Sequence, residues 1–160
     1  MGERIARVPG WCHIAEDSVW DEMPRDPHSP RTEAEKAAVQ RRVVALVAQR
    51  VHESTNVALD FILYEAPPQP IVYYQTELAK LGVQVITYVL CPSVEQILER
   101  QAKRGNSHDS QAGLSERRRN AQHQVACARS ADIDCAWLVD SLDNSIEMTY
   151  QHFFRARVEE

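Results

Sequence analysis

Two arginines near the end of a predicted helix have the type and spacing to bind phosphate. Arg100 and Arg104 are four residues apart, so both guanidinium groups lie on one face of that helix. Ser93 and Gln96 have the spacing of a capping box, which predicts where the helix begins. Two forked cations beside the polar segment 105–111 suit the transient neutralisation of phosphate. The alternative is that these cations only complement the helix macrodipole at its C-terminal end.

The elements that position these arginines alternate between strand and helix. Nearly continuous apolar runs predict strands over 13–16, 57–63, 83–90 and 136–139. Apolar residues at a spacing of three or four predict helices over 33–51, 71–81, 93–104 and 114–128, with a last one after Asn144. Strands separated by helices of this length imply right-handed crossovers and one parallel sheet between helical layers.

Length and composition exclude several classes of protein. A chain of 160 residues is most simply one domain. The net charge of −5 argues against nucleic acid as a partner, and no apolar run approaches the roughly 20 residues needed to span a bilayer. The first residues lack the apolar core of a secretory signal, so we expect a cytoplasmic protein. The four cysteines form no paired metal motif, and we interpret them as reduced and mostly buried.

The predicted ligand site lies beyond the carboxyl ends of the strands, as is usual in parallel α/β folds. The groups expected there are Asp17, Glu65, the helix start after Cys91, and Asp140. This arrangement predicts a site made mostly of acids and faced by arginines. The basic cluster at 117–119 is expected to face water or a small anion.

Four stretches of the chain resemble one known family. They read I-A-E-D-S-V-W, V-A-L-D-F-I-L, V-L-C-P-S-V-E-Q-I-L-E-R-Q-A-K-R and W-L-V-D-S-L-D-N-S-I-E. In this order they resemble small P-loop kinases, namely the shikimate and gluconate kinase-like enzymes and the chloramphenicol phosphotransferase-like group. The resemblance implies an α/β fold of three layers, with a parallel sheet flanked by helices. It also implies one P-loop NTPase-like domain over residues 1–160, with a lid at about 100–120.

The resemblance also implies roles for two acids. Asp17 falls at the position of the family's catalytic base, which binds the acceptor hydroxyl. The alternative for Asp17 is an exposed acid in a turn or a helix N-cap. Asp60 is the nearest match to the acid that assists the magnesium shell, and its alternative is a buried structural acid.

Further positions would contact the nucleotide. Arg100 and Arg104 fall where the family has its lid arginines, and Arg118 is assigned to the bound nucleotide. The turn that begins at Asp140 falls where the family packs the adenine ring, with a simple capping turn as the alternative. The implied cofactors are ATP and Mg²⁺, and the implied substrate is a small hydroxylated molecule or a nucleotide.

The family's glycine-rich loop is absent from this sequence. Phosphoryl transfer of this kind needs G-x-x-x-x-G-K-[ST], and none of the five glycines lies in such a motif. Residues 3–8 resemble the end of the helix that follows that loop, so we expect an N-terminally incomplete sheet with two exposed strand edges. We therefore expect a phosphotransferase-like protein that is inactive or impaired as this chain. The alternatives are a non-catalytic pseudokinase or interaction module, with a possible homodimer, and a flavodoxin-like binder of small ligands.

Overall fold

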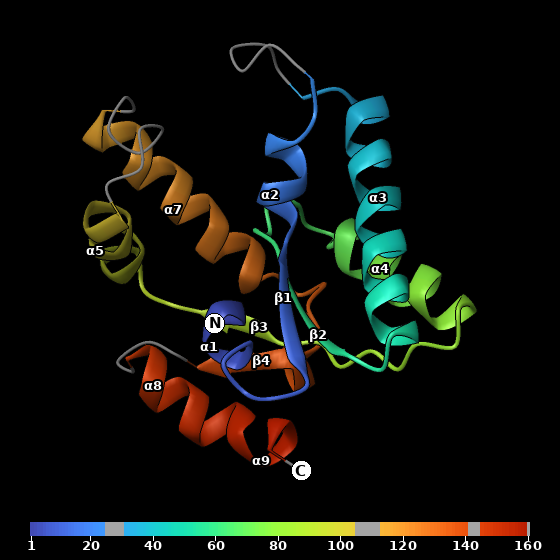
Figure 1. Cartoon of the computed structure of the whole chain (residues 1–160). Coiled ribbons are helices and arrows are strands. Elements are labelled where there is room, and N and C mark those ends of the chain that lie inside the picture. Colours follow the sequence, from blue (N-terminus) through green and yellow to red (C-terminus); the bar gives the residue numbers. More distant parts are fainter. Residues whose placement is uncertain (25–30, 105–112, 141–144, 160) are drawn as a thin grey trace. The chain divides into compact units, whose positions relative to one another are not determined.

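The chain folds as two units, each built around a pair of parallel strands (Figure 1). The computed structural model describes residues 1–24, 31–104, 113–140 and 145–159. Unit 1 comprises Met1–Phe61, Pro70–Val85 and Ile146–Glu160, and unit 2 comprises Ile62–Gln69 and Ile86–Ser145. The sequence predicts one P-loop kinase-like domain over 1–160 with a lid at about 100–120. The division into two units does not test this, and it stays a prediction.

Unit 1 holds the first strand pair and most of the helices. Its elements are α1 (Gly2–Ile5), β1 (Trp11–Ala15), α2 (Glu16–Asp21), α3 (Glu33–His52), β2 (Asn56–Asp60), α4 (Gln69–Lys80), α8 (Ile146–Thr149), a π-helical turn (Tyr150–Phe154) and α9 (Arg155–Val158). Strand β1 runs parallel to β2, with Trp11 opposite Asn56 and Ala15 opposite Asp60. Helix α3 therefore lies on the crossover between the two strands (Figure 1).

Helix α3 forms where its apolar spacing predicts it. Its N-cap is Thr32, whose side chain accepts a hydrogen bond from the Glu35 amide while the Glu35 carboxylate accepts one from the Thr32 amide. The side chains of Val39, Val43 and Val47 form its buried stripe. The predicted helix over 33–51 is confirmed.

The core of unit 1 lies where α2, α3 and α4 cover one face of the strand pair. Its buried members are Val19, Trp20, Val39, Val43, Val47, Tyr74 and Leu78. Ile14 of β1 and Leu59 of β2 pack against this cluster. Since the two strands contribute apolar side chains to the same cluster, burial of apolar surface holds the strand pair to the helices.

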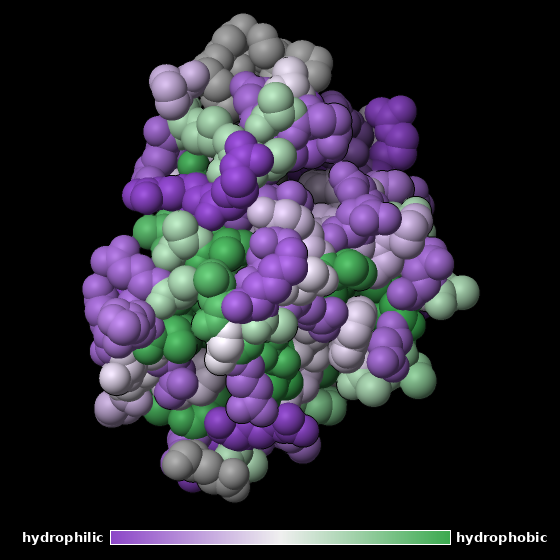
Figure 2. Space-filling model, turned by 90° about the vertical axis from the view of Figure 1, so that its right-hand side faces the viewer, coloured by the Kyte–Doolittle hydropathy of each residue, from purple (hydrophilic) through white to green (hydrophobic). Residues whose placement is uncertain are grey.

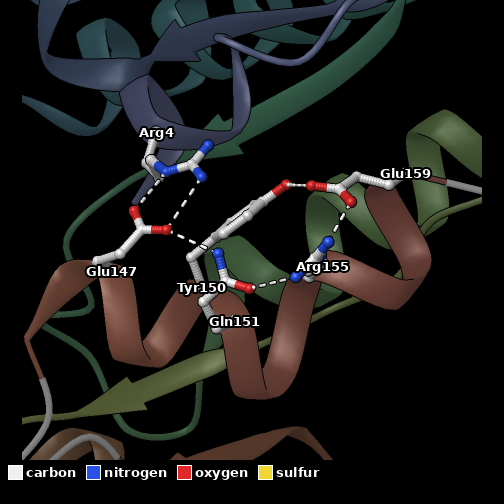
Figure 3. Close-up of polar contacts among 6 residues, drawn as sticks. All are labelled: Arg4, Glu147, Tyr150, Gln151, Arg155 and Glu159. Carbon is white, nitrogen blue, oxygen red and sulfur yellow. Dashed lines mark hydrogen bonds and ion pairs between the residues drawn. The ribbon is translucent and has the colours of Figure 1, made fainter.

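Six polar or charged residues fasten the C-terminal helical segment to α1 in unit 1 (Figure 3). They are Arg4, Glu147, Tyr150, Gln151, Arg155 and Glu159. Arg4 pairs with Glu147 and lies over the Tyr150 ring, with Cζ 3.8 Å from the ring centroid. Bonds from Gln151, Arg155 and Tyr150 continue the network as far as Glu159. Close by, the Trp11 indole donates to the carbonyl oxygen of Val158 at 3.1 Å.

Unit 2 holds the second strand pair. Its elements are β3 (Val89–Cys91), α5 (Val94–Arg104), α7 (Leu114–Ala128), a 3-10 turn (Cys135–Trp137) and β4 (Leu138–Asp140). Strands β3 and β4 are parallel, with Val89 opposite Leu138 and Cys91 opposite Asp140. The predicted capping box of α5 is confirmed, because Ser93 and Gln96 exchange backbone and side-chain hydrogen bonds of 3.1 and 3.2 Å.

The predicted three-layer fold is wrong. Helices make up most of the described residues, and the strands form two separate two-stranded parallel sheets instead of one P-loop NTPase-like sheet. The two pairings are parallel, as expected, but no described strand joins β2 to β3. Each small sheet therefore keeps strand edges that no described strand covers.

The error comes from interpreting apolar runs as strands. The run 83–90 is rich in β-forming residues, yet only Val89 and Leu90 of it belong to a strand. Val83 and Val85 instead pack against the core of unit 1 without strand pairing. Whether an apolar run becomes a strand depends on a neighbour that offers matching hydrogen bonds, and local composition does not supply that neighbour.

Large apolar side chains reach the surface at many described positions. They are Val51, Ile62, Tyr64, Val72, Leu81, Ile86, Leu114, Leu138, Ile146, Met148 and Phe153. Figure 2 shows one face on which apolar and polar surface alternate. None of the helices that the structure describes has the length and apolar character to cross a membrane.

Candidate functional site

The candidate site lies in unit 1, at the carboxyl end of β1. Strand β1 leads directly into α2, so Glu16 and Asp17 occupy the first helical turn, where carboxylates are favoured by the helix dipole. The Asp17 carboxylate is 61% exposed, and its Oδ1 lies 3.9 Å from Nη2 of Arg31. Arg31 in turn lies over the Trp20 ring, with Cζ 4.3 Å from the ring centroid. Stacking on Trp20 holds the guanidinium beside Asp17 while both remain accessible.

Glu16 anchors the first turn of α2 from the buried side. Its Oε2 accepts a 2.7 Å hydrogen bond from the Tyr74 hydroxyl of α4, and its Oε1 accepts one of 3.3 Å from the Trp20 indole. Burial raises the pKa of Tyr74 above its ordinary range, and the bond to Glu16 raises that pKa further. Tyr74 therefore stays neutral and continues to donate, which fixes Glu16 and orients the neighbouring Asp17.

Asp60 ends β2 and pairs with His13 of β1. Nε2 of His13 lies 2.8 Å from Oδ2 of Asp60, although the ring nitrogen is not aligned for a hydrogen bond. The Asp60 side chain is 47% exposed, which excludes the alternative of a buried structural acid. Gly2 of α1 lies directly against this pair, leaving no space for a Cβ atom at that position.

The arrangement can bind a polar molecule at the ends of two parallel strands. Ala15 and Asp60 lie opposite each other in the strand register, so Asp17 follows two residues beyond the position paired with Asp60. Asp17 can accept a hydrogen bond from a hydroxyl group, and Arg31 can donate to an anion with its planar fork. Among the described residues, no three His, Cys, Asp or Glu side chains are grouped so that they could hold a metal ion.

The other predicted site residues lie in unit 2. Arg118 of α7 is engaged by Glu95 of α5, with Nη1 3.4 Å from Oε1. Arg100 lies in α5 and is half-buried, while Arg104 is the last residue of that helix, with a side chain outside the described part of the structure. Asp140 ends β4, and its side chain is likewise outside the described part. Residues 105–112 lie outside the described part of the chain.

The structure thus places Asp17 and Asp60 at the carboxyl ends of β1 and β2 in unit 1, and Arg100 and Arg118 on the two packed helices of unit 2. Sequence reasoning missed two partners, Arg31 and His13. Arg31 follows a proline-rich stretch and carried no motif. His13 lies in a strand, where strict alternation put it on the face opposite Ile14, toward Asp60.

A scan against protein-family models found no match, and a search of curated proteins found none either.

Proposed function

We propose that this chain is a small-molecule kinase-like protein of the cytoplasm that binds a hydroxylated acceptor in unit 1 and transfers no phosphoryl group on its own. The acceptor would lie at the carboxyl end of β1. Asp17 accepts a hydrogen bond from its hydroxyl group, and Arg31 binds an anionic substituent. ATP and Mg²⁺ are the donor and metal that the family resemblance implies.

One observation carries this proposal. An exposed carboxylate and an exposed guanidinium lie 3.9 Å apart just beyond a parallel strand. The guanidinium of Arg31 lies over the Trp20 ring, and Asp17 follows Glu16, which the Tyr74 hydroxyl anchors. Groups at the carboxyl ends of parallel strands are where α/β proteins bind their ligands. A carboxylate at such a place can orient a hydroxyl nucleophile and accept its proton.

The absence of a phosphate-binding loop for ATP supports impaired phosphoryl transfer. No segment of the 160 residues has the glycine-rich pattern that holds the β- and γ-phosphates. The tripeptides G-K-S and G-K-T do not occur in the sequence. Arg100, Arg104, Arg118 and Asp140, all in unit 2, remain the proposed nucleotide contacts. Without the phosphate loop these contacts give weak nucleotide binding at most.

The test measures binding before activity. Shikimate and gluconate are titrated into the folded chain by ligand-observed NMR, and magnesium-ATP by calorimetry. Binding of one acid to the wild type, its loss in Asp17→Asn and its retention in Asp21→Asn support the proposal. Asp21 is the matched control because it is an exposed carboxylate on the same helix. Equal binding by both variants removes Asp17 from the site, and micromolar ATP binding with turnover contradicts the inactive assignment.

A second candidate is an interaction module that forms a homodimer. It is favoured by the strand edges of both small sheets, which no described strand covers, because such edges pair with other chains. Sedimentation equilibrium distinguishes it: a dimer at micromolar concentration that neither acid nor ATP binds favours this candidate. A monomer at all concentrations excludes it.

A further inference from the structure

A cavity lies along the free edge of β1 in unit 1, apart from Asp17. Its volume is about 420 Å³, within the usual range for small-molecule sites. Four consecutive strand residues, Cys12–Ala15, line it. Successive side chains of a strand point to opposite faces, so a cavity lined by four in a row lies against the strand edge. On that edge β1 pairs with no described strand.

The lining of the cavity combines apolar and polar side chains. Apolar side chains of Ile14, Val19 and Leu46 form a surface for a hydrocarbon body. Hydroxyl groups of Ser18 and Thr55 add two hydrogen-bonding positions. The occupant is therefore amphipathic and small.

The charges of the lining favour a cation. Glu3 and Glu22 line the cavity, and neither forms an ion pair with any residue that the structure describes. Arg50 is the one arginine of the lining, and its Nη1 lies 3.1 Å from Oε2 of Glu53, which balances its charge. His13 of the lining is paired with Asp60. Two carboxylates remain uncompensated, and an anionic ligand would be repelled.

We propose that this cavity binds a small primary amine with an apolar body. The ammonium group donates to the carboxylates of Glu3 and Glu22. The apolar body packs against Ile14, Val19 and Leu46. The site does not use Asp17 or Arg31, so it stands whether or not the proposed acceptor site does.

The probe is 2-phenylethylammonium chloride, compared with the uncharged 2-phenylethanol, each titrated into the full chain by ligand-observed NMR at constant ionic strength. We expect the amine to bind about tenfold more tightly than the alcohol, the effect of one charge-assisted hydrogen bond. Glu22→Gln and Glu3→Gln should each remove most of that difference while the alcohol binds as before. Ser18→Leu, which fills the cavity from α2, should abolish binding of both probes.

Glu33→Gln is the control, since Glu33 begins α3, pairs with Lys36 and does not line the cavity. It should bind the amine as the wild type does. Equal affinity for the amine and the alcohol overturns the proposal, as does binding of neither. The proposal is also overturned if both Glu22→Gln and Glu3→Gln bind the amine with wild-type affinity. Two separate carboxylate variants keep the test valid if one of them fails to fold.

Discussion

Arg4 and Glu147 form a two-pronged ion pair between residues that are 143 positions apart in the sequence. Nε of Arg4 lies 2.7 Å from Oε2 of Glu147, and Nη2 lies 3.1 Å from Oε1. The parallel prongs match the planar guanidinium to the carboxylate, which is the strongest geometry for such a pair. The pair therefore fixes α8 against α1 within unit 1.

The Arg4–Glu147 pair predicts a pH dependence of stability. The bond to Arg4, with help from Gln151, lowers the pKa of Glu147 from 4.5 to about 2. A carboxyl group with a lowered pKa stabilises the fold above its unfolded pKa, and this contribution is lost as the pH falls from about 4.5 towards 2. Glu147→Gln should thus have a lower urea midpoint than the wild type at pH 7, and the difference should shrink at acid pH.

The control for this experiment is Glu33→Gln, which removes an exposed pair with Lys36 inside one helix turn. Exposed pairs of this kind contribute little, so its midpoint should stay close to that of the wild type. A midpoint difference for Glu147→Gln that stays constant from pH 7 to pH 3 would contradict the assignment.

Tyr74→Phe should destabilise unit 1 by about 1–2 kcal/mol, because it deletes a hydrogen bond to a carboxylate and leaves Glu16 half satisfied. Denaturant unfolding measures the effect, with Tyr73→Phe as the control on the same helix.

The raised pKa of Tyr74 gives a second measurement, the pH at which its hydroxyl ionises. Its stabilisation is present below the ordinary tyrosine pKa of 10 and is lost as the pH rises further, so Tyr74 should ionise only when the chain unfolds. Equal stability of the two variants would show that the Glu16 bond is not formed in solution.

Gly2→Ala should destabilise the packing of α1 on the strand pair. A Cβ atom at Gly2 would overlap the His13 imidazole and lie 2.9 Å from Oδ2 of Asp60. Overpacking of this kind costs about 1–3 kcal/mol, measurable by thermal or urea unfolding. Gly113→Ala is the control, since the nearest atom to its added Cβ is 4.0 Å away. If Gly2→Ala is as stable as the wild type and its His13 NMR shifts are unchanged, then α1 does not pack against His13 and Asp60 in solution.

The cysteines should react in a defined order with a thiol reagent. Cys135 is exposed, Cys12 is half-buried, and Cys91 and Cys127 are buried. Burial also raises the pKa of Cys12, which lowers its thiolate fraction. We expect one fast thiol in the native chain, lost in Cys135→Ser, and four in denaturant. Fast reaction of Cys91 or Cys127 in the native chain would contradict their buried positions.

Helices were predictable from this sequence because their signals are local. The caps of α3 and α5 and the apolar stripe of α3 lie within a few residues of each other along the chain. Gly82, two residues after the end of α4, has a positive φ of 74°, a conformation that glycine adopts readily where a helix ends. The strand pairing was not predictable in this way. The run 83–90 could form a strand only beside a partner strand, and local sequence does not show which segment pairs with it.

The candidate site was predictable only in part. Asp17 and Asp60 follow strands, and strand ends can be located from apolar runs. Arg31 and His13 depend on contacts made by the folded chain, namely stacking on Trp20 and strand pairing opposite Ala58. When the role of a residue depends on a neighbour that is distant in sequence, the residues next to it in the sequence do not indicate that role.

Unit 1 is assembled from three separate stretches of the chain, and its last stretch, 146–160, is made after all of unit 2. Ribosomes add about 5–20 residues per second, so Arg4 and Trp11 emerge several seconds before Glu147 and Val158 exist. The nascent chain must keep α1 and β1 without their final partners during that interval. Closure of unit 1 is therefore a late event, which requires that residues 146–159 have left the ribosome.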